Sequence, residues 1–351
     1  MVIDVKKVVL GISGGVDSSV AAILLKQQGF EVIGVTFIFT EQFNIEDAQK
    51  ICEKLQIKHY VKDYRNEFRE KVINKFVSDY KSGLTPNPCV HCNKTAKLKF
   101  LFDMMKELKA DYVATGHYAK IIDGKLYKSE NQDKDQSYFL SQLSKAELNR
   151  ILFPLNDLAK QEVRDIAEQN GLINASKKDS FDVCFITTTF RDYMANNIAN
   201  VSGPIVDIES DLEVGKHEGL AYYTIGQRRG LNLGGSKQRS FVVGKNINKN
   251  ILYVTGENSQ DYLYSNSALI ENTNWIGDEK IKKCSAKFRY RQADNEVQLE
   301  HLENGNILVK YSQGIKSVTP GQACVFYDGD ECLGGGTIKE VYKDNKKIWY
   351  L

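Results

Sequence analysis

The sequence predicts an α/β protein that begins with a doubly wound parallel sheet and continues into a β-rich second half. Up to about residue 170, short β-branched runs alternate with segments whose apolar residues recur at helical spacing. Beyond about residue 200, short runs of alternating apolar and polar residues are separated by turn residues. The length of 351 residues is too great for one small core, so two or three domains are expected.

The predicted elements of the first half follow a β-α-β order. Buried strands are predicted at residues 7–12, 31–37, 58–61 and 111–117, and helices at 18–28, 45–55, 66–80, 97–108 and 160–169. Strands of the second half are predicted at 240–244, 250–254 and 307–311. We therefore expect an α/β domain at residues 1–198, a small central linking domain at 199–262 and a C-terminal β-barrel at 263–351.

The composition indicates an ordinary globular protein. Hydrophobic residues make up 42% of the chain, and no run approaches the roughly 18 to 20 apolar residues of a membrane span. Seven irregularly spaced cysteines do not form the disulfide framework of a small secreted protein, so a reducing compartment is expected. A net charge of +2 leaves any nucleic-acid binding to local basic patches. We expect a cytoplasmic protein without membrane association.

A glycine-rich turn joins the first strand to the first helix and has the features of a phosphate-binding loop. Glycines let the backbone approach a phosphate, while successive N–H groups and the helix N-terminus point at its negative charge. Ser13 and Ser18 add hydroxyl donors, and Asp17 is a candidate ligand for Mg²⁺. No lysine follows the glycines, so the loop is not a Walker A motif. Residues 11–18 instead resemble the PP-loop of ATP pyrophosphatases, which cleave ATP to AMP and pyrophosphate while adenylating an oxygen.

A Cys-x-x-Cys pair, Cys89 and Cys92, follows Asn87 and Pro88 and precedes a helix expected from about residue 94. Thiols near a helix N-terminus are well placed for lowered pKa values. Half of a structural zinc site is the alternative, although Cys324 and Cys332 are far away in the sequence. Cys184, between apolar residues, is by itself more typical of a small buried side chain.

The order of motifs resembles the bacterial tRNA-specific 2-thiouridylases, the MnmA family, over essentially the whole chain. The PP-loop carries this resemblance together with residues 85–88, 92–94, 114–118, 134–140, 178–180, 184–186, 226–228, 289–292, 319–322 and 333–336. The resemblance implies a PP-loop domain of the adenine nucleotide alpha-hydrolase-like fold and an ATP- and Mg²⁺-dependent sulfurtransferase. Such an enzyme adenylates the wobble uridine of tRNA and transfers sulfur to C2, giving 2-thiouridine, AMP and pyrophosphate.

Roles for individual residues follow from the same resemblance. Cys184 would accept sulfur as a persulfide from a donor protein, and Cys92 would help release it, as a base or through a transient disulfide. ATP would be bound by Gly11, Ile12, Ser13, Gly14, Gly15, Val16, Asp17, Ser18, Phe37 and Gly116. The tRNA anticodon loop would be contacted by Asn87, Pro88, Cys89, His117, Lys134, Asp135, Gln136, Arg289, Tyr290 and Gln322. We expect a monomer.

A basic stretch at residues 280–291 makes RNA binding physically plausible. Six lysines and arginines are interleaved there with Phe288 and Tyr290. Basic groups neutralise phosphates, and aromatic rings stack on unpaired bases, as in recognition of single-stranded RNA loops.

Position 89 departs from the best-known members of the family, which carry aspartate there. Cys89, Cys92 and Cys184 would make three soft ligands, which suit a [4Fe–4S] cluster with one iron open to sulfide. Persulfide and cluster-bound sulfide therefore both remain open as sulfur carriers. Two other functions also remain: a PP-loop ligase that forms amides, and a non-catalytic module that binds RNA or an iron–sulfur cluster.

Overall fold

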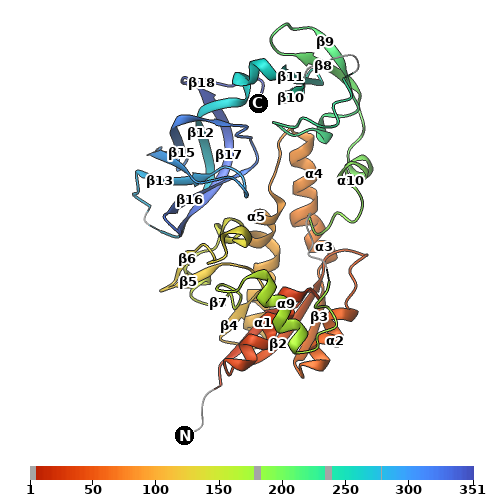
Figure 1. The fold of residues 1–351 in the computed structure, drawn as a ribbon, viewed down its shortest axis with the longest axis vertical. Coiled ribbons are helices and arrows are strands. Elements are labelled where there is room, and N and C mark those ends of the chain that lie inside the picture. Colours follow the sequence, from red (N-terminus) through yellow and green to blue (C-terminus); the bar gives the residue numbers. More distant parts are fainter. Residues whose placement is uncertain (1–4, 178–182, 234–238, 278) are drawn as a thin grey trace.

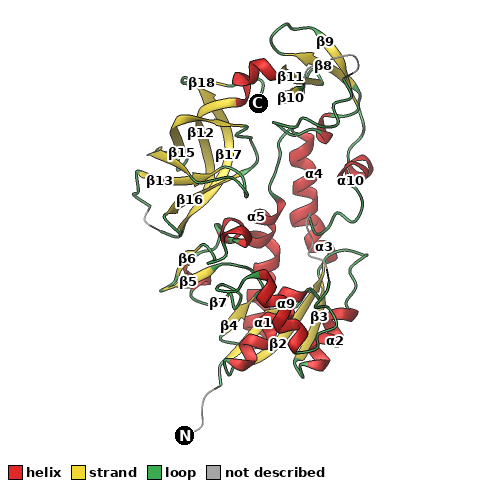
Figure 2. Cartoon of the chain, viewed as in Figure 1, coloured by secondary structure: helices red, strands yellow, loops and turns green. Residues whose placement is uncertain are grey.

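The computed structural model describes residues 5–177, 183–233, 239–277 and 279–351, and its strands form three β-sheets. The sequence motif at residues 178–180 lies outside the described residues. The parallel sheet and its helices occupy the end that holds the N-terminus, and the other two sheets lie side by side beyond it (Figure 1). Figure 2 shows the change from helix-rich to strand-rich structure along the molecule. Among the described helices, each is too short or too polar to span a lipid bilayer.

The first sheet is parallel and has the strand order β3-β2-β1-β4-β7. Its strands are β1 (Lys7–Gly11), β2 (Glu31–Ile38), β3 (Lys58–Asp63), β4 (Tyr112–Ala114) and β7 (Ile151–Leu152). Successive residues of β1 enter different cores: Val8 and Leu10 pack with α1 (Val16–Gln27), α2 (Glu46–Lys54) and α9 (Lys160–Gln169), and Val9 packs with α6 (Leu98–Glu107). Helices therefore cover both faces, which confirms the predicted doubly wound sheet.

Two of the predicted helices are organised differently in the structure. The helix expected at 66–80 consists of α3 (Arg65–Phe68), the π-helical η1 (Arg69–Ile73) and α4 (Asn74–Lys81). The helix expected from 97 begins as α5 (Pro88–Cys92) and runs through the π-helical η2 (Asn93–Lys97) into α6. The early start has a local cause: the Asn87 side chain accepts a hydrogen bond from Val90 N–H (3.2 Å), and Pro88 suits the first helical turn.

Short helices complete the first half and the linking region. They are η3 (Gln132–Lys134), α7 (Ser137–Leu140), α8 (Lys145–Leu148), α10 (Phe190–Asn197), η4 (Leu220–Tyr222) and η5 (Glu257–Leu263). The central sheet has the order β10-β11-β8-β9, with β8 (Gly203–Asp207), β9 (Glu213–His217), β10 (Ser240–Asn246) and β11 (Ile251–Gly256).

The third sheet closes into a barrel because its first strand, β12, pairs with both β15 and β17. The barrel strands are β12 (Tyr264–Trp275), β13 (Lys283–Lys287), β14 (Asn295–His301), β15 (Ile307–Lys316), β16 (Ala323–Asp328) and β17 (Glu331–Lys343), with β18 (Lys346–Lys347) beside β17. A hairpin from the first half, β5 (Lys120–Ile122) and β6 (Lys125–Tyr127), extends this sheet through β6 and β17. The predicted barrel is confirmed, and its attachment to the α/β domain by strand pairing was not predicted.

Candidate active site

The glycine-rich loop between β1 and α1 is held in shape by its own serines. Ser18 Oγ accepts from Ser13 N–H (3.2 Å) and donates to the Gly15 carbonyl (3.0 Å). Gly14 adopts φ +75°, and a Cβ there would lie 3.0 Å from Asp47 Cβ, so both its conformation and its surroundings require glycine. The loop therefore presents backbone rather than side chains at the start of α1, as phosphate binding requires.

Polar side chains from α9 and from the segment after it contact the glycine-rich loop and the start of α1. Lys160 Nζ lies 2.6 Å from Asp17 Oδ1, which also accepts from the Tyr118 hydroxyl at 2.8 Å. Asn174 Nδ2 donates to the Gly14 carbonyl and to Ser19 Oγ, both at 3.0 Å. Lys160 and Asn174 could not be predicted from the sequence, because only the packing of α9 against α1 brings them to the loop.

The two further residues expected to bind ATP lie at the carboxyl edge of the sheet. A Cβ on Gly116 would lie 2.9 Å from Asp17 C and Ser18 N, so the end of β4 touches the first turn of α1. Phe37 is buried and packs edge-on against Tyr64 (5.4 Å between ring centroids) and Phe100 (6.1 Å). This edge is where parallel α/β sheets bind ligands.

The three cysteines singled out in the sequence lie within electrostatic reach of one another. Cys89 and Cys92 are half-buried on α5, and Cys184 is exposed in the loop before α10. Burial, and then the nearby Cys184 charge, raises the pKa of Cys89 to about 11 and that of Cys92 to about 12. Cys184 is accessible to solvent, yet desolvation by the surrounding protein raises its pKa as well. The expected lowering of the thiol pKa values is wrong, because desolvation outweighs the helix N-terminus.

Lys97 is the cation shared by these thiols. Its charge opposes the rise in pKa of Cys89, Cys92 and Cys184, and its backbone N–H bonds the Cys92 thiol. Lys97 ends the π-helical segment η2, which follows Cys92 directly, and π-helical turns are common at functional sites. The role of Lys97 could not be predicted from the sequence, since a spacing of five residues does not place two side chains together on a regular α-helix.

The cysteines do not form a metal site in this arrangement. Within the described ranges, no group of three His, Cys, Asp or Glu side chains is placed to hold one metal ion. All seven cysteines carry free thiols, and Cys324 and Cys332 are buried in the barrel. The described residues therefore do not form the structural zinc site, and binding of an iron–sulfur cluster by the three cysteines stays a prediction.

Several residues expected to contact tRNA are buried and engaged with protein. His117 is 8% exposed, its Nδ1 lies 2.7 Å from Thr115 Oγ1, and burial followed by the Lys97 charge holds its pKa well below the usual value. Asp135 is also buried and accepts from Ser129 N–H and from Ser137, while burial raises its pKa. Gln136 Oε1 accepts from Tyr118 N–H (3.0 Å), and Lys134 lies in η3. Their contact with RNA stays a prediction.

The expected tRNA contacts of the barrel lie where the barrel meets other parts of the chain. Arg289 Nη2 donates to the Ile225 carbonyl (2.9 Å) and to Thr319 Oγ1 (2.8 Å). The Tyr290 ring lies 4.3 Å from that of Phe139. Gln322 donates to the carbonyl of Thr85, just ahead of Asn87 and Pro88.

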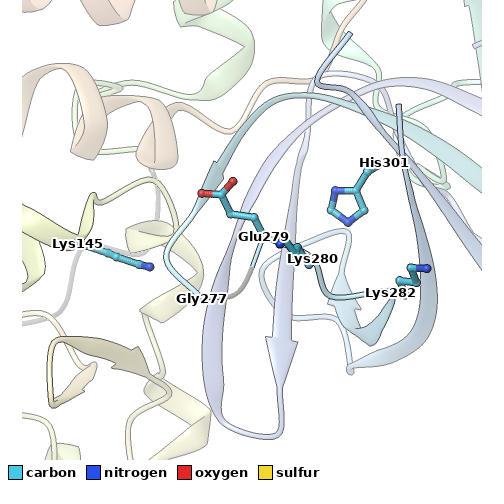
Figure 3. Close-up of a pocket in the computed structure, with 6 residues that line it drawn as sticks. All are labelled: Lys145, Gly277, Glu279, Lys280, Lys282 and His301. Carbon is cyan, nitrogen blue, oxygen red and sulfur yellow. The ribbon is translucent and has the colours of Figure 1, made fainter. Parts of the chain in front are cut away.

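A pocket of about 630 Å³ lies between α8 and the barrel. It is lined by Lys145, Gly277, Glu279, Lys280, Lys282 and His301 (Figure 3). Figure 3 shows Lys145 reaching toward it from the α/β domain, across from the barrel residues. Its lining is mostly basic and contains none of the cysteines, so this pocket is not the thiol site.

Comparisons with known proteins cover almost the whole chain. Family models described as a tRNA methyl transferase HUP domain, a tRNA methyl transferase PRC-barrel domain and an aminomethyltransferase beta-barrel domain match residues 6–188, 191–256 and 265–338. Relatives called tRNA-specific 2-thiouridylase MnmA include one from Mycoplasmopsis synoviae, 46% identical over 99% of both chains. Another, from Geobacillus thermodenitrificans, is 43% identical over 98% of both chains. A solved 4-thiouridine synthetase in complex with RNA and ATP matches 51% of this chain and 44% of its own, at 19% identity and a TM-score of 0.36.

Proposed function

Because this chain belongs to the tRNA-specific 2-thiouridylase family, we propose that it replaces the C2 oxygen of the wobble uridine of tRNA with sulfur in an ATP-dependent reaction. A tRNA substrate would place this reaction in the cytoplasm. The observation that carries the proposal is that three thiols lie within electrostatic reach of Lys97, in the same domain as the glycine-rich loop.

The first half of the reaction would activate the uracil. The C2 oxygen is a poor leaving group, and its attack on the α-phosphate of ATP makes AMP the leaving group and releases pyrophosphate. The N–H groups of residues 13–18 would bind the phosphates, and Lys160 would neutralise charge on the departing pyrophosphate. Asp17 would help bind the Mg²⁺ that accompanies ATP. This assignment is supported by the closeness of Gly116 and Lys160 to Asp17.

The second half would transfer sulfur through Cys184, whose exposure suits contact with a donor protein that leaves a persulfide there. The terminal sulfur would attack C2, and AMP would leave with the C–O electron pair. A Cys92 thiolate would then attack Cys184 Sγ and break the S–S bond, leaving the sulfur on C2 and a Cys92–Cys184 disulfide. A dithiol reductant would have to restore the two thiols at each turnover. The chain would act as a monomer on one tRNA.

Nucleoside analysis of tRNA incubated with the protein, ATP and a persulfide donor tests the proposal. We expect 2-thiouridine with the unaltered protein and with Cys284→Ser, and none with Cys92→Ser or Cys184→Ser. Unmodified uridine in every reaction would refute the proposal. A methylated nucleoside in place of 2-thiouridine would instead indicate the methyl transfer that the family-model description names.

Substitution of Cys89 distinguishes the two proposed sulfur carriers, a persulfide and an iron–sulfur cluster. If sulfur travels as a persulfide, Cys89→Asp, which introduces the residue of the best-known members, should retain activity. If sulfur travels on an iron–sulfur cluster, this variant should lose both activity and the iron bound by anaerobically purified protein.

A further inference from the structure

The segment that leads into α5, the helix that carries Cys89, is bonded to the barrel at Thr85. Thr85 N–H donates to the Pro320 carbonyl at 3.0 Å, and Gln322 Nε2 donates to the Thr85 carbonyl at 2.7 Å. The N–H and the carbonyl of Thr85 are thus both hydrogen-bonded to one turn of the barrel, although Gln322 and Thr85 are 237 residues apart in the sequence.

This contact is a direct approach of two backbones. Gly321, between the two barrel partners, has φ +92°, and a Cβ there would lie 3.0 Å from Thr85 N and from Leu84 Cβ. Its N–H donates to the Ile338 carbonyl (2.8 Å), and Ile338 N–H donates to the Gln322 carbonyl (2.8 Å). The turn is therefore fixed to strand β17 and cannot move independently of the barrel.

The chain between Thr85 and Cys89 is stiff. Two of its three residues are Pro86 and Pro88, and a proline ring fixes φ. The third, Asn87, caps α5 and bonds the Tyr138 hydroxyl, which in turn donates to the barrel carbonyl of Ala323 at 2.8 Å. A displacement of Thr85 is therefore transmitted to Cys89, because the residues between them have little conformational freedom.

We propose that Gln322 is a positioning residue for sulfur transfer: its amide holds Thr85 and thereby sets where Cys89 and Cys92 lie relative to Cys184. The inference rests on the proposed function for its catalytic consequence. It differs from the tRNA contact expected from the family resemblance, because the partner of the Gln322 amide in the structure is the Thr85 carbonyl.

The test compares Gln322→Met, which keeps the length of the side chain and removes the donor, with Lys282→Met in the basic pocket. Alkylation of Cys89 and Cys92 by iodoacetamide is followed by mass spectrometry in the full-length protein without tRNA, with Cys284 as the internal reference. We expect Gln322→Met to change the alkylation rates of Cys89 and Cys92 about threefold or more and Lys282→Met to leave them unchanged. This measurement needs no turnover, so it reports on positioning even if thiolation itself is not observed.

Thiolation kinetics give the second measurement. Misplacement of a reacting group by a fraction of an ångström lowers kcat by about tenfold, whereas KM for tRNA should change less than twofold in Gln322→Met. Gln322→Asn, which keeps the amide but is too short to reach Thr85, should behave in the same way and serves if the methionine variant does not fold. A raised KM for tRNA with unchanged kcat and unchanged alkylation would overturn the proposal and make Gln322 an RNA contact.

Discussion

Replacing Gly116 by alanine tests whether the end of β4 and the first turn of α1 form one ATP-binding surface. The added Cβ would lie 2.9 Å from Asp17 C and Ser18 N, and both atoms belong to the backbone. Since nonbonded carbon atoms pack at about 3.5 Å or more, the two elements must separate by about 0.6 Å. Overpacking of this kind costs about 1–3 kcal/mol of stability. A displacement of this size at a reacting phosphate should lower the rate of adenylation about tenfold or more.

Pyrophosphate release in the presence of tRNA measures the expected loss, and calorimetric titration with ATP shows whether binding fails as well. Gly29→Ala is the matched control, because Gly29 has φ +86° and its Cβ would meet no atom within 4 Å. That variant should lose about 1 kcal/mol of stability through backbone strain and keep its ATP affinity. If Gly116→Ala releases pyrophosphate within twofold of the unaltered protein, β4 does not help to shape the site.

Three further predictions concern buried or bound charges. Lys245→Met should raise the free energy of unfolding near pH 7 by about 3 kcal/mol, because burial lowers the pKa of Lys245 from 10.5 to about 8 and no partner in the described structure bonds its amine. In the unaltered protein, the destabilisation caused by Lys245 decreases as the pH rises from 8 to 10.5, because over this range the unfolded chain binds one proton more than the folded chain. Denaturant unfolding at pH 7 and pH 10 checks both statements. His117→Gln should flatten the loss of stability below about pH 6.5, since the unfolded chain takes up a proton that buried His117 does not, and melting temperatures from pH 7 to pH 5 measure it. Lys160→Met should weaken ATP binding about tenfold or more by removing a charge-assisted contact, whereas Lys177→Met, whose exposed partner is Asp47, should weaken it less in the same titration; equal effects would contradict the role given to Lys160.

The sequence was informative where the relevant interactions are local. Strand β1 and the loop after it could be predicted because apolar runs, glycines and serines act on their immediate neighbours. The start of α5 could not, because Pro86 and Pro88 indicate a turn unless Asn87 is recognised as a cap. Hairpin β5–β6 was also missed, since its strands have three residues each and pair with a strand of the barrel.

In the candidate site, too, the sequence identifies residues in local motifs but not the effects of tertiary packing. Cys92 and Cys184 could be named from sequence motifs, but the direction of their pKa shifts could not, because desolvation depends on which elements pack over them. Lys97 and Lys160 are two of 47 lysines and arginines, and only their positions in the folded chain distinguish them from the others. Gln322 was expected at the RNA, and its bond to Thr85 depends on the contact between two domains.

The pairing of β6 with β17 has a consequence for synthesis of the chain. Lys125 and Glu331 form an ion pair across this junction and are 206 residues apart. At roughly 5–20 residues per second, a ribosome needs about 10–40 s between making one strand and making the other. During that interval the hairpin exposes an unpaired edge, together with the Leu126 side chain that is fully buried in the finished fold. The β6 edge of the nascent α/β domain therefore stays open until the barrel has been translated and β17 pairs with it.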